Sequence, residues 1–550
     1  MAQAPQVIET SPIAQSMVAT IYDPIIITFD QPVNEATITS STFQVFGRWS
    51  GPMDGIYSFE AGSTKVKFTP MRNFFYGEWV KVGLSSGIEN TAGNPLTNGY
   101  SFNYWTKALP ASLDLVFAGQ INMRMSGEGQ ITCYGAYAGD INNDELSDLV
   151  VVVEDSDDIR VLLNDGSNNY DPFVIIELPP VQGPSTNEGA DFNHDGLIDI
   201  AIGSTYADQV NVLRGDASTF FGDQFDYQTG EGVRGLTVAD FNGDGWDDIA
   251  TANRFASTLT ILMNDGTGEF EPAVTVETGL EGETAIAATD LNGDGSMDLL
   301  VAGYTSSRLT SLLNDGTGNF TIYDTSTSSS GPWMIAIGDV NGDGFVDVAS
   351  ANSLTHRISI FRTDGLGGLE FDADYNVDTF PVAIDLGDID GDGDLDFISS
   401  NVLGPNYTLM ENDGTGTFIN PRTYSSPAGA ACATIHDRNN DGAMDITMID
   451  EANDVVLMYN NTLNLNISDP DLETGLALYP NPFQNKINVG GVITGSLKLF
   501  LYDVHGRLLY KQPMEGTNQF DLSELNLSEG MYFAEVYYRG YFQKFKIFKN

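Results

Sequence analysis

Basic residues are scarce in this chain of 550 residues. It has 24 lysines and arginines against 76 aspartates and glutamates, which gives a formal net charge of −52. A surface of this sign repels the phosphates of nucleic acids and of anionic membranes, so we expect neither as a partner. Apolar residues still make up 41% of the sequence. That is enough to bury real cores, so the acidity does not indicate a disordered tail.

Cysteines and long apolar stretches are also few. The two cysteines, Cys133 and Cys432, exclude a disulfide framework. They lie seven and five residues before acidic loops, so in regular strands both side chains are expected to point the same way. Two buried thiols are the default interpretation, and a disulfide between them is the alternative. No stretch approaches 18 apolar residues, so we expect no transmembrane segment.

A repeat dominates the middle of the sequence. An acidic loop of the form Asp-x-Asn/Asp-x-Asp-Gly-x-x-Asp begins at residues 140, 191, 240, 290, 339, 388 and 437, with Glu145 in place of the glycine in the first loop. The intervals between these positions are 51, 49, 50, 49, 49 and 49 residues. A constant period of this length is typical of a repeat architecture.

Each unit predicts four short strands. In the third unit we expect strands at 235–239, 249–252, 259–263 and 270–277, with a hairpin turn signalled by Asn-Asp-Gly-Thr-Gly at 264–268. Four short strands with Gly-rich turns indicate a β-propeller blade. The seventh unit lacks its fourth strand, and residues 113–118, before the first loop, are expected to complete it and close the ring.

The loops are predicted metal sites. Their first, third, fifth and ninth positions offer side-chain oxygens and the seventh its carbonyl, and calcium takes six to eight oxygen ligands. A glycine at the sixth position permits the sharp turn, so Glu145 puts only the first turn in doubt. No glutamate occurs at the twelfth position, which excludes EF-hands. The alternative is that Asp and Asn only build turns, but seven loops in register favour about seven calcium sites.

The predicted calcium ligands are, loop by loop, Asp140, Asn142, Asp144, Leu146 and Asp148; Asp191, Asn193, Asp195, Leu197 and Asp199; Asp240, Asn242, Asp244, Trp246 and Asp248; Asp290, Asn292, Asp294, Ser296 and Asp298; Asp339, Asn341, Asp343, Phe345 and Asp347; Asp388, Asp390, Asp392, Asp394 and Asp396; and Asp437, Asn439, Asp441, Ala443 and Asp445.

The repeat resembles the FG-GAP/VCBS family, whose type members include integrin α-subunit propellers. The resemblance covers residues 108–463 and implies a seven-bladed β-propeller. It also implies that the acidic loops join the first two strands of each blade on one face of the ring, and that ligands bind the opposite face.

The N-terminal residues 1–107 have a different pattern. Strand-like runs at 25–29 and 64–69 accompany Thr-Phe-Asp-Gln-Pro-Val at 28–33 and Asn-Thr-Ala-Gly-Asn-Pro at 90–95. This order resembles bacterial Ig-like domains, which implies an Ig-like β-sandwich. Another all-β topology is the alternative.

The C-terminal part changes composition again. Residues 464–474 are expected to form a linker, and 475–550 hold Leu-Tyr-Pro-Asn-Pro-Phe at 478–483 and a basic end at 544–549. This segment resembles the C-terminal sorting domain of type IX secretion cargo from Bacteroidetes. The resemblance implies that the type IX machinery is a partner, and that the protein is secreted and then released or attached to the outer surface. An ordinary small β-sandwich is the alternative.

No catalytic constellation stands out in the sequence. The four histidines form no His-x-x-x-His pair, and there is no Gly-x-Ser-x-Gly elbow or phosphate-binding glycine loop. We therefore predict no catalytic residue and no cofactor besides calcium. A glycosidase pair of carboxylates outside the loops stays open.

A ligand site is expected on the face opposite the acidic loops. The connections between second and third strands lie there, and aromatic residues beside Asn and Arg suit carbohydrate or peptide ligands. The alternative is that the aromatics pack between blades. Asn253 and Asn352 belong to these connections, and the predicted ligand-binding residues are Tyr206, Arg254, Phe255, Tyr304 and Trp333.

Three functions remain open at this point. We favour a secreted or surface-displayed binding protein, an adhesin or lectin-like module in which calcium is structural. The second is an extracellular polysaccharide lyase or hydrolase on a propeller scaffold. The third is a structural surface component with the Ig-like domain as a spacer.

Overall fold

The computed structural model describes residues 3–463 apart from 168 and 181, and then 477–490, 497–502, 508–514, 519–525, 527–528, 530–538 and 541–550. The chain divides into two compact units, Met1–Asn464 and Leu465–Asn550. The predicted linker at 464–474 lies outside the described residues. All described elements are strands except two short 3-10 helices, η1 (Glu35–Thr37) and η2 (Ser523–Leu525), so the protein is all-β. Neither of these described helical segments has the length and apolarity that crossing a membrane requires.

The N-terminal part of the first unit is a β-sandwich of two four-stranded sheets. In strands such as β7, alternate residues are buried, so each sheet turns one apolar face inward. Ile27, Phe43, Val66 and Val80 meet in the core between the sheets. One sheet has the order β1 (Val7–Ser11), β2 (Ile25–Phe29), β6 (Lys65–Pro70) and β5 (Gly55–Glu60), and the other β4 (Gly51–Pro52), β3 (Phe43–Gly47), β7 (Trp79–Leu84) and β8 (Tyr100–Trp105).

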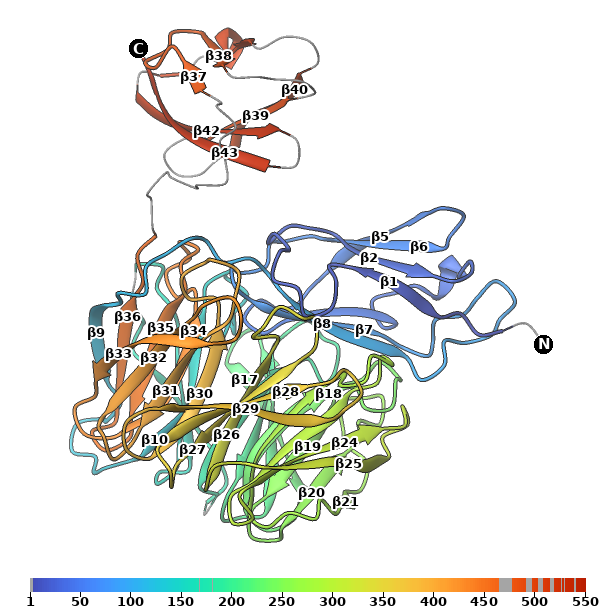
Figure 1. Ribbon diagram of the computed structural model, residues 1–550, viewed down its shortest axis with the longest axis vertical. Helices are drawn as coiled ribbons and strands as arrows, with labels where there is room; N and C mark the ends of the chain where they lie inside the picture. The colour runs from blue at the N-terminus through green and yellow to red at the C-terminus, as the bar shows by residue number, and fades with distance from the viewer. Residues whose placement is uncertain are drawn as a thin grey trace. The chain divides into compact units, whose positions relative to one another are not determined.

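Seven four-stranded antiparallel sheets follow and form the propeller (Figure 1). Their strands are β10 (Cys133–Gly139), β11 (Asp148–Val153), β12 (Asp158–Leu162) and β13 (Val174–Glu177); β14 (Pro184–Ala190), β15 (Asp199–Ser204), β16 (Gln209–Asp216) and β17 (Phe220–Gln228); β18 (Val233–Ala239), β19 (Asp248–Asn253), β20 (Thr258–Leu262) and β21 (Val274–Val276); β22 (Glu283–Thr289), β23 (Asp298–Gly303), β24 (Arg308–Asn314) and β25 (Phe320–Thr327); β26 (Pro332–Gly338), β27 (Asp347–Asn352), β28 (Arg357–Thr363) and β29 (Leu369–Asn376); β30 (Pro381–Gly387), β31 (Asp396–Asn401), β32 (Asn406–Asn412) and β33 (Phe418–Ser425); and β34 (Ala430–His436), β35 (Asp445–Asp450), β36 (Val455–Asn460) and β9 (Val116–Asn122).

The ring closes as the sequence predicts. The strand before the first loop, β9, pairs with β36 and completes the seventh sheet, although it begins at Val116 rather than at residue 113. The first strand of each sheet packs on the first strand of the next, and β34 packs on β10. Closure leaves no exposed sheet edge at the junction of the two chain ends of the propeller.

A single asparagine links neighbouring sheets. Asn264, at the end of the third sheet's third strand, donates its side-chain N–H to the Phe192 carbonyl of the preceding loop at 3.0 Å. Asn164, Asn314, Asn412 and Asn461 make the corresponding bond to the loop before theirs. The Asn-Asp-Gly-Thr-Gly pattern therefore does more than form a hairpin turn.

Every first strand carries a β-bulge near its beginning. The pairing register with the second strand skips one residue in all seven sheets, and in three of them the skipped residue is Tyr134, Arg234 or Trp333. A bulge redirects the side chain of its extra residue out of the regular alternation. These three side chains are positioned in this way.

The bulges also affect the cysteines. Both thiols are free, Cys133 is fully buried, and Cys432 lines the central channel. The disulfide alternative is not found. The prediction that both side chains point the same way assumed that side chains alternate regularly along these strands. Cys432 is instead equivalent to Gly135, and the bulge at Tyr134 interrupts the alternation between Cys133 and that position.

The second unit is a smaller β-sandwich, as expected for 475–550. Phe483, Val489, Leu501, Phe520 and Val536 are buried in its core. One sheet has the order β37 (Ala477–Tyr479), β38 (Lys486–Gly490) and β41 (Gln519–Asp521), and the other β40 (Leu508–Met514), β39 (Leu497–Tyr502), β42 (Gly530–Tyr538) and β43 (Tyr541–Lys549).

Candidate functional site

All seven acidic loops join the first and second strands of their sheet and share one conformation. The fifth-position Asp accepts the seventh-position N–H, and the third-position oxygen accepts the fifth-position N–H, as in Asp244 with Trp246 and Asn242 with Asp244. The same pair of bonds recurs in the other six loops. The predicted side chains are therefore gathered around each loop's own backbone.

The ninth-position aspartates are fully buried. Asp199, for example, accepts hydrogen bonds from the Phe192 and Gly215 amides at 2.9 and 2.7 Å. Burial raises the pKa of Asp148, Asp199 and Asp445 to about 8, with neighbouring loop carboxylates adding to the rise. The first-position carboxylates behave alike, and burial raises the pKa of Asp191 to about 7. Each loop thus concentrates negative charge away from water, which is costly without a cation.

The sixth loop brings carboxylate oxygens close together. Oxygens of Asp388, Asp390 and Asp392 lie within 4.8 Å of one another. Both Asp388 oxygens and one of Asp394 are buried and accept no well-formed hydrogen bond from the described residues. In the seventh loop one buried Asp445 oxygen is in the same condition. Hard oxygen donors without partners suit calcium or a similar ion.

The first loop departs from the others at its sixth position. Glu145 adopts a φ of 66°, in the left-handed region that glycine occupies in the other six loops. The turn therefore forms despite the glutamate, and the Glu145 amide still donates to Asp140 at 3.0 Å. Arg72 of the Ig-like domain lies 3.2 Å from the same carboxylate.

Replacing the exposed Glu145 with glycine should stabilise the protein. A non-glycine residue in the left-handed region costs about 1 kcal/mol. We expect Glu145→Gly to raise the free energy of unfolding by about that amount, measured by urea denaturation. Glu145→Gln, which removes the same negative charge but keeps a Cβ at the left-handed position, is the control. An unchanged or lower stability of Glu145→Gly would show that the turn carries no such strain.

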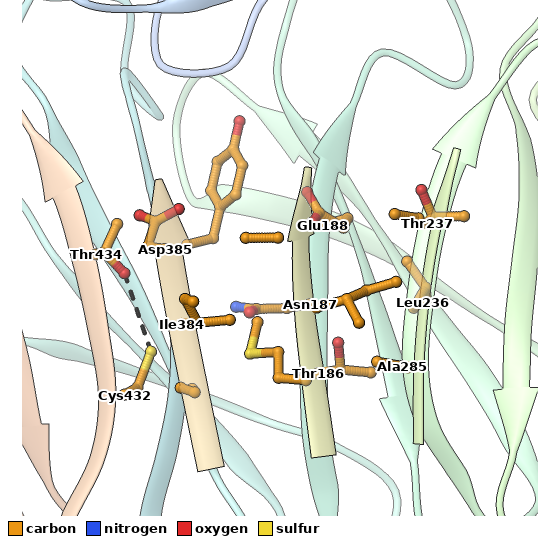
Figure 2. A pocket seen from close by; sticks show the side chains of 18 of the residues that line it. Thr186, Asn187, Glu188, Leu236, Thr237, Ala285, Ile384, Asp385, Cys432 and Thr434 are labelled. Carbon is orange, nitrogen blue, oxygen red and sulfur yellow. Dashed lines mark hydrogen bonds between the residues drawn. The ribbon is translucent and has the colours of Figure 1, made fainter. Parts of the chain in front are cut away.

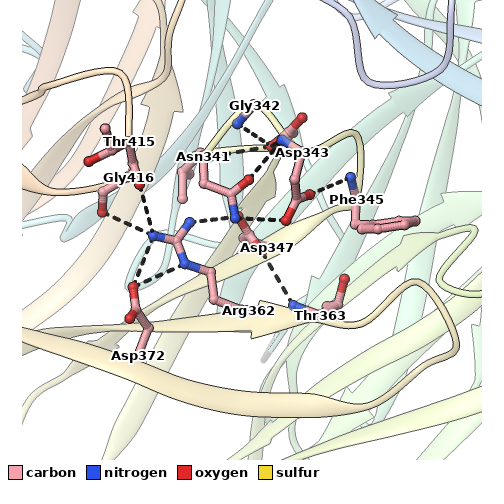
Figure 3. Close-up of polar contacts among 12 residues, drawn as sticks. Asn341, Gly342, Asp343, Phe345, Asp347, Arg362, Thr363, Asp372, Thr415 and Gly416 are labelled. Carbon is pink, nitrogen blue, oxygen red and sulfur yellow. Dashed lines mark hydrogen bonds and ion pairs between the residues drawn. The ribbon is translucent and has the colours of Figure 1, made fainter.

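In the fifth loop an arginine side chain lies beside the buried carboxylate (Figure 3). Arg362, on β28, places its guanidinium 2.9 Å from the buried ninth-position carboxylate of Asp347 and 2.9 Å from Asp372. It also donates to the Thr415 and Gly416 carbonyls of the next sheet at 3.4 and 3.3 Å. In five other loops the matching carboxylate oxygen instead accepts the second-position amide.

The Ig-like domain covers the face that carries the acidic loops. Its backbone amides of Ser86 and Ser101 donate to the Gly243 and Gly295 carbonyls at 2.7 and 2.8 Å. Leu109 and Ala111, in the connection to the propeller, donate to the Gly442 and Asp390 carbonyls at 2.9 and 2.7 Å. Lys81 pairs with Asp247 at 2.5 Å. Because these contacts reach loops around the ring, the domain is a cap on this face rather than a free spacer.

A cavity of about 250 Å³ runs along the axis of the ring and is lined by the first strands of all seven sheets. Phe46, Trp79 and Trp105 of the Ig-like domain line its end under the cap. Glu188 and Asp385 project into it from β14 and β30 (Figure 2), and Arg48 lies 3.5 Å from Asp385. Burial raises the pKa of both Glu188 and Asp385, while Arg48 opposes the rise.

Tyr134 and Arg234 line the cavity at its opposite end, and Trp333, Arg254 and Tyr304 pack beside them. These five residues are termed here the channel mouth. Arg254 lies with its guanidinium carbon 4.7 Å from the Trp333 ring centre and 5.1 Å from that of Tyr304. The Trp333 indole N–H donates to the Tyr134 hydroxyl at 3.0 Å. Three of the five residues predicted to bind ligand are thus brought together.

The other two predicted residues surround this cluster. Tyr206 and Phe255 are 58% and 57% exposed and stand at the equivalent position of the second and third sheets. Each ring rests on a glycine with positive φ, Gly183 or Gly232, where a Cβ would lie 2.3 or 2.4 Å from the ring. Leu354 and Leu403 continue this exposed apolar row in the fifth and sixth sheets.

Two asparagines that sequence reasoning placed on this face are unavailable to a ligand. Asn253 and Asn352 are fully buried and bond to hydroxyls of their own sheets, Asn253 to Thr260 at 2.9 Å and Asn352 to Ser359 at 2.8 Å. Conversely, Tyr134 and Arg234 were missed. Aligning the repeats would have identified them, because they occupy in the first and third sheets the position that Trp333 occupies in the fifth.

Two histidines near the loops have structural surroundings. His436 is buried between Ser147 and Thr447 at 2.7 and 2.8 Å, and burial lowers its pKa to about 3. His194 stacks on Trp246 with ring centres 3.8 Å apart. Both positions agree with an incidental place beside the loops.

Three family models match the chain. The FG-GAP-like repeat matches residues 140–202, 191–251, 240–301, 290–350 and 339–399. The chain contains FG-GAP-like repeats. The bacterial Ig-like domain matches residues 1–106, and the secretion system C-terminal sorting domain matches 477–550. The FG-GAP-like repeats therefore lie in a protein sorted by type IX secretion to the cell surface or the extracellular space.

Solved structures that are similar to this chain have low sequence identity to it. An Agrocybe aegerita lectin that recognises non-reducing terminal N-acetylglucosamine is 18% identical, with 72% of this chain and 94% of the lectin covered and a TM-score of 0.39. A functionally unknown protein from Desulfotomaculum acetoxidans is 12% identical, with 67% and 95% covered and a TM-score of 0.40. No curated protein matches the sequence.

Proposed function

We propose that this secreted protein is a binding module of the adhesin or lectin type, with calcium as a structural ion and the ligand site at the channel mouth. The observation that supports this most is the asymmetry of the two faces. The Ig-like domain covers the acidic loops, whereas the channel mouth presents arginines, packed aromatic rings and the exposed side chains of Tyr206 and Phe255. Ligand sites are usually lined by apolar and aromatic side chains with a small number of polar groups among them.

The calcium part of the proposal follows from the carboxylates. The first, third, fifth and ninth positions would hold the ion, with the seventh-position carbonyl, and the ion would supply the positive charge that the buried carboxylates lack. Buried oxygens of Asp388, Asp394 and Asp445 that accept no well-formed hydrogen bond from the described residues support this. Ion binding to the folded state alone becomes free energy of folding.

The fifth loop is expected to bind calcium most weakly, because Arg362 already neutralises Asp347. Arg362→Ala should destabilise the calcium-free protein by about 3 kcal/mol, since it leaves a buried carboxylate unpaired. In saturating calcium the loss should shrink, because the ion takes over the neutralisation. Urea denaturation with and without calcium measures both values. Arg422→Ala, which breaks the more exposed pair with Asp114, is the matched control. An equal loss in both conditions would contradict a calcium ion near Asp347.

The binding proposal is tested on arrays of glycans and of surface proteins, with the calcium-loaded full chain as the probe. We expect captured ligands whose signal falls at least about tenfold in Phe255→Ala, because exposed aromatics provide most of such contacts. Phe371→Ala, an exposed phenylalanine on the outer strand β29, is the control. Equal signals from both variants would place the ligand elsewhere, and no capture at all would reject the binding module.

A polysaccharide-active enzyme is the second candidate, favoured by one observation. Glu188 and Asp385 are carboxyls with raised pKa that share one cavity, and paired carboxylates of shifted pKa serve as acid and base in glycoside hydrolysis. Release of new reducing ends or unsaturated products from a polysaccharide, lost in Glu188→Gln, would establish it. Intact substrate after prolonged incubation would reject it.

A further inference from the structure

Three bulges aim side chains at the channel mouth. Tyr134, Arg234 and Trp333 are the skipped residues of the first, third and fifth sheets, and in this way they come within reach of one another. Arg234 lies with its guanidinium carbon 5.2 Å from the Tyr134 ring centre and 5.9 Å from that of Trp333. Bulges recur beside functional sites because they redirect a side chain while the rest of the strand stays paired.

Trp333 thus has two guanidinium groups around it. Arg234 pairs with Glu154 at 3.5 Å, but its Nε and Nη1 are buried and have no acceptor among the described residues. Arg254 has cation–π contacts with Trp333, Tyr304 and Phe255, and its side chain makes no hydrogen bond or ion pair within the part of the chain that the structure describes. Partial burial, and then the charge of Arg234, lower the pKa of Arg254.

An uncompensated arginine is unexpected in this chain. Acids outnumber basic residues by 76 to 24, so an arginine has many possible partners, yet Arg254 is held on aromatic rings instead. Two acids near the channel mouth are already engaged or weakened. Glu154 serves Arg234 and accepts the Tyr206 hydroxyl at 3.2 Å, and burial raises the pKa of Glu451 to about 7. The free N–H donors of Arg254 form a fork that matches a carboxylate.

We infer that the channel mouth binds a carboxylate-bearing sugar, a uronic acid residue of an acidic glycan, with Arg254 pairing with its carboxylate. This inference rests on the proposed binding function and names its ligand class. The half-exposed rings of Tyr206 and Phe255 flank the cluster and offer the flat apolar surfaces on which a sugar ring packs. The strongly negative surface elsewhere repels acidic glycans, so such a ligand is directed to a cluster in which two arginines lie on aromatic rings.

The test is isothermal titration calorimetry of the calcium-loaded full chain. The probes are a short galacturonic acid oligosaccharide, the galactose oligosaccharide of the same length, and an oligoglutamate peptide. Short oligosaccharides avoid the bridging of long acidic chains by calcium. We expect the galacturonate to bind at least about tenfold more tightly than the neutral sugar, because a charge-assisted pair is lost with the carboxylate. Arg254→Gln should abolish this preference, and Phe255→Ala should weaken both sugars.

Arg422→Gln is the matched control, because it removes the same charge from the outer strand β33 and should bind like the wild type. Equal affinity for both sugars, or an unchanged galacturonate affinity in folded Arg254→Gln, would overturn the inference. Tighter binding of the peptide would overturn the sugar assignment. Capture of neutral glycans alone on the array would overturn the ligand class and leave the proposed function standing. No ligand of any kind would reject both.

Discussion

Removal of calcium is expected to lower the melting temperature of the propeller by about 20 °C. An ion present at a hundred times its dissociation constant stabilises the folded state by about 2.7 kcal/mol per site. Several sites therefore contribute on the order of 10 kcal/mol, and each kcal/mol shifts the melting temperature of a large domain by about 2 °C. Once the ion leaves, the buried carboxylates of Asp199, Asp388 and Asp445 are each repelled by the other carboxylates of their own loop.

Differential scanning calorimetry of the full chain in calcium, and in chelator with and without restored calcium, measures this shift. Asp294→Ala, which removes one fifth-position ligand, should take away a single site's share and leave the rest. Magnesium at the same concentration is a control for ionic strength and charge. A melting temperature unchanged by chelation would show that the loops are turns and not metal sites.

The calcium-free protein is expected to lose stability as the pH rises from 5.5 to 8. Burial raises the folded pKa of every ninth-position aspartate above the ordinary value of 3.8, to about 8 at Asp148 and about 7 at Asp298. The folded state therefore binds more protons than the unfolded state in this window, and stability falls with rising pH. The contributions of the seven loops add in this direction. Glu78, which burial raises to a pKa of about 7, contributes in the same direction.

Calcium should reverse this trend. Protons compete with the ion for the same oxygens, so in calcium the stability should rise over the range in which it falls without calcium. Urea denaturation at pH 5.5, 6.5 and 8, in calcium and in chelator, gives both slopes. A calcium-free protein that is more stable at pH 8 than at pH 5.5 would contradict the raised pKa values of the loop carboxylates.

The fold could be predicted largely from the spacing of the loops. A constant period fixes one supersecondary unit per repeat, and the missing strand of the last unit demands a partner from the other end, which β9 supplies. The strands of the third unit, expected at 249–252 and 259–263, are found at Asp248–Asn253 and Thr258–Leu262. Local patterns suffice where each strand is bounded by glycine turns.

Only some residues of the channel mouth could be predicted from the sequence. Turn residues such as Arg254 and Tyr304 follow from the repeat, but the bulges that bring Tyr134 and Arg234 beside them are a matter of strand register, which polar and apolar alternation does not specify locally. Arg362 was missed for another reason. Its guanidinium pairs with Asp347 and Asp372 of its own sheet and also reaches the Thr415 and Gly416 carbonyls of the next sheet, which the pattern of one repeat does not show.

The covering of the loop face by the Ig-like domain was also not foreseen. Ser86 and Ser101 are ordinary turn and strand residues in the sequence, and only their amides' bonds to Gly243 and Gly295 show which face is blocked. This contact leaves the channel mouth as the open end of the channel. We therefore propose a structural role for the face that carries the acidic loops and ligand binding for the face that carries the channel mouth.

Hydrogen–deuterium exchange of the calcium-loaded full chain tests that assignment most directly, with and without the galacturonic acid oligosaccharide. We expect slower exchange on ligand addition at the amides of 133–136, 233–236 and 333–335 and in the turns at 205–208, 254–257 and 304–307. Exchange at the acidic loops and in the Ig-like strands should be unchanged. Protection confined to the loops or to the Ig-like domain, or no protection anywhere, would contradict it.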